Sequence, residues 1–321
     1  MIRAILQFMQ AKGSGEAALR RFLTFAAVYG EEAAIAACAS AKMLEREIGV
    51  KADVAQNIIA AQSKAAMLSD SLAERSIKAL WLGSPEYPER LEKILLNDAP
   101  PVLFAQGNLT LLNTSSVAFS GSRKASEKGL EVTRLCAMQM ARTGICVTSG
   151  YAHGVDMAAH QAALKNGGTT IMVLVEGILR FQAKPQIADL LSPDNHLAIS
   201  QFSPNLTWSG HNAMRRNDTI IGMTDSMILV EAGFSGGTFA AGENTLRRKR
   251  PLFVVDFAEP ELSAEANSWF IQNGGTAIRK NQDGIPNLNR LKAAILEQSW
   301  KQPTPETTSL FNWNHQKLNI R

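Results

Sequence analysis

The chain has 321 residues, 45% of them hydrophobic, so it is long enough to bury a sizeable core and to form more than one domain. Its 33 basic and 29 acidic residues give a formal net charge of +4, which argues against a polycation that binds by charge alone. The three cysteines argue against a disulfide framework, and no apolar run reaches the roughly 20 residues that span a bilayer. We therefore expect a soluble protein of the reducing cytoplasm, with no membrane partner.

Residues 1–80 are rich in alanine and nearly free of proline, and their apolar positions recur at helical spacing. This pattern predicts a small all-α module of the SAM or helix-hairpin-helix kind. Within it, Gly13-Ser14-Gly15 precedes an amphipathic stretch, an arrangement by which a helix-hairpin-helix offers backbone N–H groups to a DNA phosphate. A plain turn between two helices needs the same glycines, so both interpretations stay open.

Residues 81–114 contain four of the twelve prolines and predict a connector with one short helix and one short strand. From 115 to 285, strands and helices alternate, which is typical of an α/β, Rossmann-like domain with a doubly wound, mostly parallel sheet. Residues 286–321 are expected to form a C-terminal tail with one short helix. In the central domain we expect strands near 117–120, 145–149, 169–175, 197–201, 226–231, 251–255 and 276–279, and helices near 127–142, 156–166, 184–191, 215–223, 238–248 and 263–272.

Three of these strands run into a glycine-containing turn that opens a helix. The segments are VAFSGSR at 117–123, ICVTSGYAHGVD at 145–156 and SMILVEAGFSGGT at 226–238. Glycine lets the backbone approach a phosphate closely, and the free N–H groups and aligned dipoles of the first helical turn favour an anion. Because ligands of a doubly wound sheet lie outside the carboxyl ends of its strands, we expect the three turns to converge on one cleft.

Cationic side chains lie beside these turns. Arg123 follows the first turn, and Arg215, Arg216 and Asn217 are expected to open a helix near it, so that guanidinium groups clamp phosphate. The GxGxxG fingerprint of dinucleotide binding is missing after the first strand. We therefore expect no redox cofactor and no metal. Trp208 could either stack on a base or anchor its loop.

The spaced motifs match one family in the right order. SGSRKASEKG at 120–129, TSGYAHGVDMAAHQAALKNGGTTIMVL at 148–174 and MRRNDTIIGMTDSMILVEAGFSGGTFAA at 214–241 resemble the DNA-processing protein family called DprA or Smf. The upstream segment YPERLEKILLNDAPPVLFAQGN and the helical module are similar to that family as well. The resemblance covers about residues 1 to 280.

The resemblance implies a homodimeric single-stranded DNA binder without catalytic activity, which delivers strands to the RecA recombinase during natural transformation. Asp156, His160 and Glu231 are expected to organise the pocket, with Asp156 capping helix N–H groups and His160 bonded to that carboxylate. The residues expected to bind DNA phosphate, most of them in the family's motifs, are Gly121, Ser122, Arg123, Ser149, Gly150, Gly154, Arg215, Arg216, Asn217, Ser235, Gly236, Gly237 and Thr238.

The sequence also departs from the family pattern. Asp218 stands where members usually have the second arginine of an RNR element, and Val175, Glu176 and Phe181 replace glycines and a tyrosine-proline pair. We therefore expect two carboxylates, Asp218 and Glu176, in a normally basic mouth. The winged helix that many members carry has no room after residue 286, which suggests a shortened, divergent relative.

Two other functions stay open on these departures. A pocket of mixed charge would suit a small nucleotide, and a nucleotide-hydrolysing enzyme could use Glu231, Glu243 or Asp156 as its general acid or base. The resemblance also extends to members that act as partners or antitoxins of phosphoribosyltransferase-like proteins in phage defence.

Overall fold

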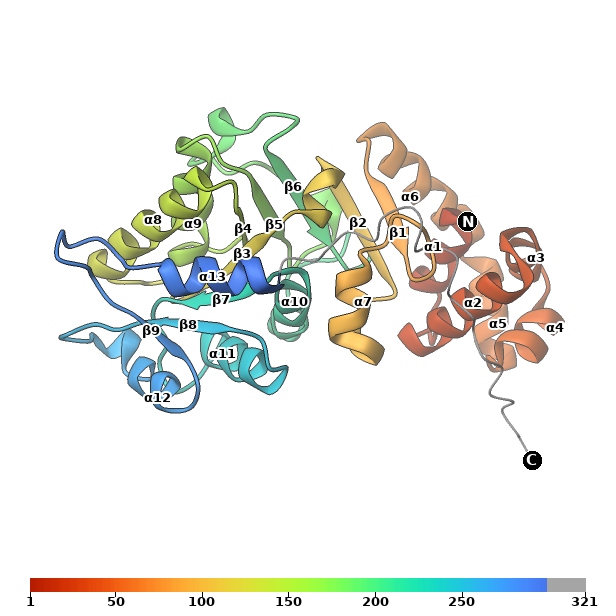
Figure 1. Ribbon diagram of the computed structural model, residues 1–321. Coiled ribbons are helices and arrows are strands. Elements are labelled where there is room, and N and C mark those ends of the chain that lie inside the picture. The colour runs from red at the N-terminus through yellow and green to blue at the C-terminus, as the bar shows by residue number, and fades with distance from the viewer. Residues whose placement is uncertain (299–321) are drawn as a thin grey trace.

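A computed structural model describes residues 1–298, in which one nine-stranded sheet is covered by helices on both faces and carries an all-α module at one end (Figure 1). Residues 299–321 of the predicted tail lie outside this described part. The predicted fold class, an α/β domain preceded by helices, is confirmed. Within residues 1–298, no helix combines the length and the apolar content that crossing a bilayer requires.

The N-terminal helices pack on one another and on the antiparallel end of the sheet. Their buried side chains, such as Phe8, Phe22 and Ile58, form one continuous apolar cluster with Phe104 of the sheet. The elements of this module are α1 (Ile2–Gln10), α2 (Glu16–Tyr29), α3 (Glu31–Ala37), α4 (Ala41–Met43), a π-helical turn (Leu44–Ile48), α5 (Ala52–Ala60) and α6 (Gln62–Glu74).

The sheet has the strand order β1-β2-β6-β5-β4-β3-β7-β8-β9. The pairs β1–β2 and β2–β6 are antiparallel and all the others are parallel. The strand order reverses between β3 and β7, as in a doubly wound fold. The strands are β1 (Lys78–Trp81), β2 (Val102–Gly107), β3 (Ser116–Ser120), β4 (Cys146–Ser149), β5 (Thr170–Val173), β6 (His196–Ser200), β7 (Ser226–Leu229), β8 (Leu252–Val255) and β9 (Thr276–Ile278).

Two apolar layers hold the helices against the sheet, because the parallel strands are buried on both faces. One layer joins the strands to α7 (Glu89–Leu95), α10 (Gly210–Met223), α11 (Gly237–Arg247) and α12 (Asn267–Gln272). The other joins them to α8 (Glu127–Arg142), α9 (Val155–Lys165) and α13 (Asn289–Gln298).

All seven predicted strands of the central domain are present, with bounds that differ by at most two residues. The predicted connector contains α7 and β2, whereas β1, at its border with the helical module, was not predicted. The helix predicted over 184–191 is wrong: only the 3-10 turn Ala188–Leu190 forms, and the backbone is extended again at Leu191. The helix predicted over 263–272 is divided into a 3-10 turn (Leu262–Ala264) and α12.

Candidate phosphate-binding pocket

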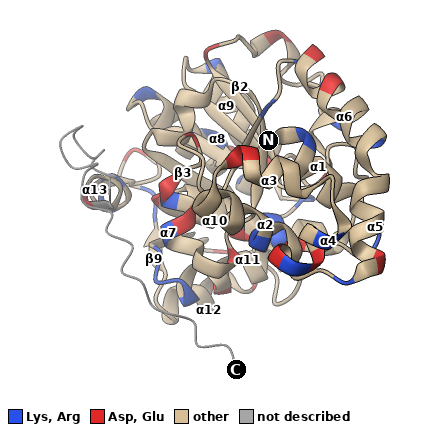
Figure 2. Cartoon of the chain, turned by 90° about the vertical axis from the view of Figure 1, so that its right-hand side faces the viewer, with Lys and Arg blue, Asp and Glu red and all other residues tan. Residues whose placement is uncertain are grey.

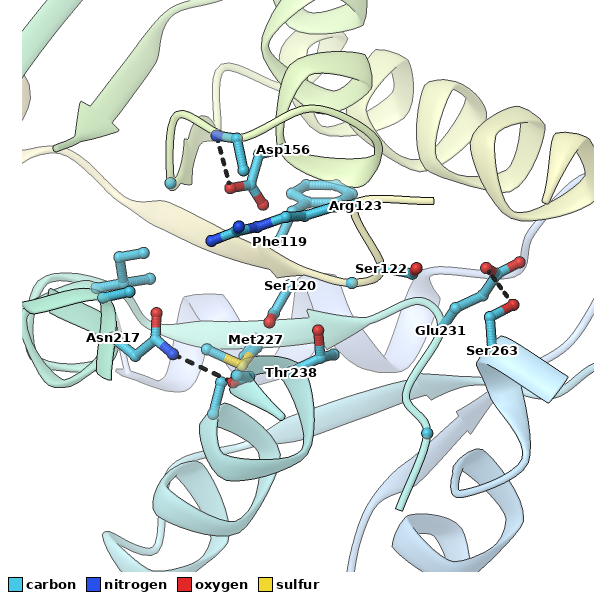
Figure 3. Close-up of a pocket in the computed structure, with 18 of the residues that line it drawn as sticks. Phe119, Ser120, Ser122, Arg123, Asp156, Asn217, Met227, Glu231, Thr238 and Ser263 are labelled. Carbon is cyan, nitrogen blue, oxygen red and sulfur yellow. Dashed lines mark hydrogen bonds between the residues drawn. The ribbon is translucent and has the colours of Figure 1, made fainter. Parts of the chain in front are cut away.

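A pocket of about 440 Å³ lies at the carboxyl ends of β3 and β7, where the strand order reverses (Figure 3). Residues of all three glycine turns line it, so the structure brings the turns together at one site. The charged lining residues are three cations and two carboxylates, a net charge of 3 − 2 = +1: Arg123, Lys124, Arg216, Asp156 and Glu231.

The third turn is open to the pocket. Gly236 has a φ of 89°, a conformation that glycine adopts without strain, and no atom lies within 4 Å of a Cβ added at Gly236 or Gly237. No side chain caps the N-terminus of α11, which begins at Gly237, so the first N–H groups of this helix remain available. Ser235, Gly237 and Thr238 line the pocket directly. This turn has the geometry of an anion site.

The first two turns need their glycines for packing within the protein. A Cβ at Gly121 would lie 2.5 Å from the Val155 side chain, and one at Gly154 would overlap the Ser122 carbonyl oxygen. A Cβ at Gly150 would overlap the ends of Arg216 and Asp156. These glycines therefore let α9 and the turns approach one another, and they contribute to the pocket mainly by shaping it.

Arg216 is the most deeply buried cation of the pocket, with 6% of its surface exposed. Its Nη1 donates to the Val173 carbonyl oxygen at 2.9 Å, whereas its Nε has no partner. Burial lowers the pKa of the guanidinium, and the nearby Asp156 opposes this effect. Since Arg216 lines the pocket and makes one hydrogen bond to protein, its guanidinium is suited to bind an anion there.

The two chain neighbours of Arg216 differ in their relation to the pocket, because successive residues of a helix are turned by about 100°. Arg215 does not line the pocket: it forms an ion pair with Glu16 of α2 and lies 5.8 Å from the Phe202 ring. Asn217 lines the pocket and donates to the Gly237 carbonyl oxygen at 3.2 Å, which ties α10 to the third turn (Figure 3). The helix begins at Gly210, five residues before its predicted start.

The two carboxylates expected in the mouth do not line the pocket. Asp218 lies 3.4 Å from the Arg248 Nε and accepts a hydrogen bond from Asn244 of α11. Its charge is therefore paired with Arg248, the residue that follows α11. Burial raises the pKa of Asp218, and Arg248 opposes that rise. Glu176 follows β5, outside the lining. The expectation that both acids enter the mouth is therefore wrong.

Arg123 extends from the first turn across the pocket toward the side where Asn217 lies (Figure 3). Its guanidinium carbon is 5.6 Å from the Trp208 ring centre, a cation–π contact, so Trp208 covers this arginine. Ser122 lines the pocket, and its hydroxyl accepts from the Lys124 N–H at 3.1 Å. Lys124 is a pocket cation that sequence reasoning missed, although it directly follows the SGSR motif.

Lys184 is a second missed cation, and it lies beside the Gly150 turn. Its Nζ donates to the Tyr151 carbonyl oxygen at 2.5 Å and lies 4.5 Å from the Tyr151 ring centre. Burial lowers its pKa, and Asp156 and Glu176 oppose that effect. No local motif marks this lysine, because residues 184 and 151 meet only through the fold.

Asp156 and His160 organise the second turn, but not through the bonds that the sequence suggested. Asp156 does not cap its helix; it accepts from the Ala152 N–H at 3.2 Å and from the Ser149 hydroxyl at 2.9 Å. Ser149 is fully buried and does not line the pocket. His160 contacts the Gly150 carbonyl oxygen and the Thr170 hydroxyl, both at 2.6 Å, and forms no hydrogen bond with Asp156.

We expect the stability of the protein to fall below about pH 6.5, because burial lowers the pKa of His160. Below this pH, His160 is protonated in the unfolded chain but not in the folded chain. The free energy of unfolding therefore falls by up to about 1.4 kcal/mol per pH unit until the folded-state pKa is reached. Urea unfolding at pH 7.5, 6.5 and 5.5 measures this slope. His160→Gln should reduce it, whereas replacement of the exposed His153 should leave it unchanged; equal slopes in both variants would contradict the assignment.

Glu231 lines the pocket but is almost fully buried, and its carboxylate accepts several hydrogen bonds from protein. Its carboxylate accepts from the N–H and the hydroxyl of Ser126, the N-cap of α8, and from the Ser263 hydroxyl at 2.8 Å (Figure 3). Gly129 leaves the room that this carboxylate occupies. These bonds favour a structural role at the first turn of α8. Glu243, the other carboxylate considered for catalysis, is exposed on α11 and does not line the pocket.

Three glycine turns at the switch point of a doubly wound sheet define a Rossmann-like protein with a candidate anion-binding pocket. A model of the family described as DNA recombination-mediator protein A matches residues 78–289. The chain therefore belongs to this family, which includes the proteins named DprA and Smf.

Individual relatives agree with this membership. The chain is 32% identical over 199 residues to DNA processing protein DprA of Streptococcus pneumoniae, a match that covers 61% of this chain and 69% of that protein. It is 28% identical over 232 residues to Protein Smf of Escherichia coli, covering 68% of this chain and 62% of that protein. The chain thus spans about two thirds of the length of these relatives.

Two solved structures share the fold. The X-ray structure of DprA from Streptococcus pneumoniae superimposes with a TM-score of 0.72 at 24% identity, covering 88% of this chain and 96% of that one. A structure of DprA from Helicobacter pylori, described as giving insights into a unique single-stranded DNA binding mode, has a TM-score of 0.57 at 23% identity and covers 69% of this chain and 96% of that one.

Proposed function

We propose that this protein binds single-stranded DNA by its phosphates at the pocket, largely without regard to sequence, and acts in DNA processing and recombination. The observation that carries the proposal is the open N-terminus of α11, which lines the same pocket as the buried Arg216 with its unpartnered Nε. Both features favour the binding of an anion. Family membership supports nucleic acid as that anion, and the single-stranded DNA named for the Helicobacter pylori structure supports a single strand.

The pocket residues divide the work by chemistry. The N–H groups of Gly237 and Thr238 and the Ser122 hydroxyl donate to phosphate oxygens, while Arg123 and Lys124 supply the charge that releases counterions. Asn217 holds α10 against the third turn. Backbone contacts of this kind carry no base information, so affinity should vary little with sequence.

On the side seen in Figure 2, the described residues of the helical module present no basic track that would compete with the pocket. In the view of Figure 2, basic and acidic residues are mixed over the described part of the helical module, without a continuous basic stripe. The pocket has a net charge of +1 (three cations, two carboxylates), which is too small to hold a long polyanion by charge alone. It suits a short stretch of nucleic-acid backbone. Delivery of the strand to RecA, assembly as a homodimer and a cytoplasmic location complete the proposal, on the strength of family membership.

A small nucleotide is the second candidate ligand, because 440 Å³ lies within the range of small-molecule pockets. Nucleoside monophosphates would then compete with an oligonucleotide at concentrations well below those at which inorganic phosphate competes. Release of free base during the incubation would show that the protein is an enzyme.

Replacing Arg123 and Lys124 together by alanine should weaken oligonucleotide binding and flatten its salt dependence. Each phosphate contact that is lost reduces the slope of log K against log salt by about 0.7 for a single strand, so the pair should reduce it by about 1.4. Anisotropy titrations of a labelled oligonucleotide between low and physiological salt measure this slope.

The matched control removes two cations far from the pocket. Arg142 and Lys165 are exposed at the C-terminal ends of α8 and α9, the ends opposite the turns. Their double alanine variant has the same net charge as the pocket variant and should keep the wild-type slope. Equal slopes in the two double variants would place the DNA elsewhere on the protein.

A further inference from the structure

Phe234 is an aromatic side chain that the fold leaves in solvent at the edge of the pocket. It is 55% exposed, although 45% of the chain is hydrophobic and the core accommodates large aromatic rings such as Phe104, Phe119 and Phe270. Its two chain neighbours, Gly233 and Ser235, line the pocket. The ring therefore stands immediately beside the open third turn.

The ring is supported from behind. Its centroid lies 6.1 Å from that of Phe239, which in turn lies 5.4 Å from Trp269 and 5.1 Å from Phe270. The backbone before it is fixed as well, because the Ala232 N–H donates to the Asn267 side chain at 3.0 Å and the Ala232 carbonyl accepts from the Ala266 N–H at 2.9 Å. A ring held in this way can receive a partner without first being ordered.

The position of the ring relative to the anion site indicates what the partner is. A nucleotide carries a flat base next to its phosphate, and Phe234 supplies an exposed flat ring three residues before the start of α11. A protein ligand would need a broader apolar surface, whereas the chain neighbours of the ring, Gly233, Ser235, Gly236 and Gly237, contribute none.

We propose that Phe234 is a base-stacking platform. One nucleotide places its phosphate at the N-terminus of α11 and stacks its base on the Phe234 ring. This inference rests on the proposed function and adds to it a contact that is independent of charge. Trp208 follows β6 and Phe234 follows β7, strands on opposite sides of β3, so the two exposed aromatics mark two sides of the pocket. The strand then crosses the pocket past the third turn.

The test compares oligonucleotide affinity at two ionic strengths for wild type, Phe234→Ala, Phe234→Trp and Tyr29→Ala. Stacking of one base is worth about 1–3 kcal/mol, so Phe234→Ala should weaken binding at least about fivefold. Its salt slope should stay that of wild type, because stacking releases no counterions. Phe234→Trp should restore the affinity, and Tyr29→Ala, which removes an equally exposed aromatic from α2, should have no effect.

An oligonucleotide with consecutive abasic positions supplies the second arm. Wild type should bind it more weakly than the intact strand, and Phe234→Ala should bind both about equally. If Phe234→Ala binds the intact strand as tightly as Tyr29→Ala does, the stacking role is overturned while the DNA function stands. If wild type shows no salt-dependent binding of DNA, the proposed function fails first, and this inference with it.

Discussion

Replacing Arg216 by methionine should reduce the affinity for single-stranded DNA by about 100-fold, because the loss of a buried charged partner in an interface costs about 2–5 kcal/mol. The fold should survive, because the guanidinium makes one hydrogen bond to protein and methionine fills a similar volume without a charge to desolvate. Asp156 loses a nearby countercharge, so some loss of stability should accompany the loss of affinity.

Arg215 is the natural control, since it is adjacent in sequence and has the same chemistry. It forms an ion pair with Glu16 outside the pocket, with 36% of its side chain exposed. Arg215→Met should therefore change affinity by no more than a few-fold. Oligonucleotide titration and urea unfolding of both variants separate the two roles. Equal losses of affinity would mean that the helix contributes general positive charge and that the buried position of Arg216 has no special part.

Asp225→Ala should destabilise the protein by about 3–5 kcal/mol, because it leaves a buried charge without its partner. Asp225 directly precedes β7 and is 1% exposed. Its carboxylate accepts from the Arg90 guanidinium and from the Ser116 N–H, both at 2.8 Å, so the substitution removes both acceptors at once. Arg90 also donates to the Met223 carbonyl oxygen at 2.7 Å. This cluster joins α7, β3 and β7 at the end of the sheet opposite the pocket.

Asp70→Ala provides the comparison, since Arg3 and Asp70 form an ion pair at 3.1 Å with both side chains more than 60% exposed. An exposed pair of this kind should change the free energy of unfolding by less than about 1 kcal/mol. Urea unfolding monitored by circular dichroism measures both variants. Similar losses in the two would show that the buried pair contributes no more than the surface pair, and that the backbone hydrogen bonds hold this junction.

The position of the pocket was predictable, because it depends on local signals that the fold preserves. Apolar runs followed by glycine identified β3, β4 and β7, and parallel strands bring their carboxyl ends to one edge. The difference between Arg215 and Arg216 depends on helix rotation, and a single step turns a side chain by about 100°. The same rotation turns Asp218 away from the pocket. The earlier start of α10 had a local signal, since the Ser209 hydroxyl accepts from the Asn212 N–H as an N-cap.

Other features of the site had no local signal. Lys184 contacts Tyr151 across 33 residues, and His160 finds its partners in Gly150 and Thr170 rather than one turn away on its own helix. The sequence could not show why the first two turns need glycine, because a nearby ligand and a neighbouring protein atom would both exclude a Cβ there. Only the positions of Val155, Arg216 and the Ser122 carbonyl show that the neighbour accounts for Gly121, Gly150 and Gly154.

The helical module contacts both α10 and the loop before it. Glu16 holds Arg215, and Gln10 donates to the Ser203 hydroxyl at 2.6 Å in the loop that leads to Trp208. The helical module thus holds both the rotation of α10 about its axis and the position of that loop. The module itself contributes no side chain to the pocket lining. A displacement of α1 or α2 would therefore reach both α10, which carries Arg216, and the loop before Trp208, which contacts Arg123.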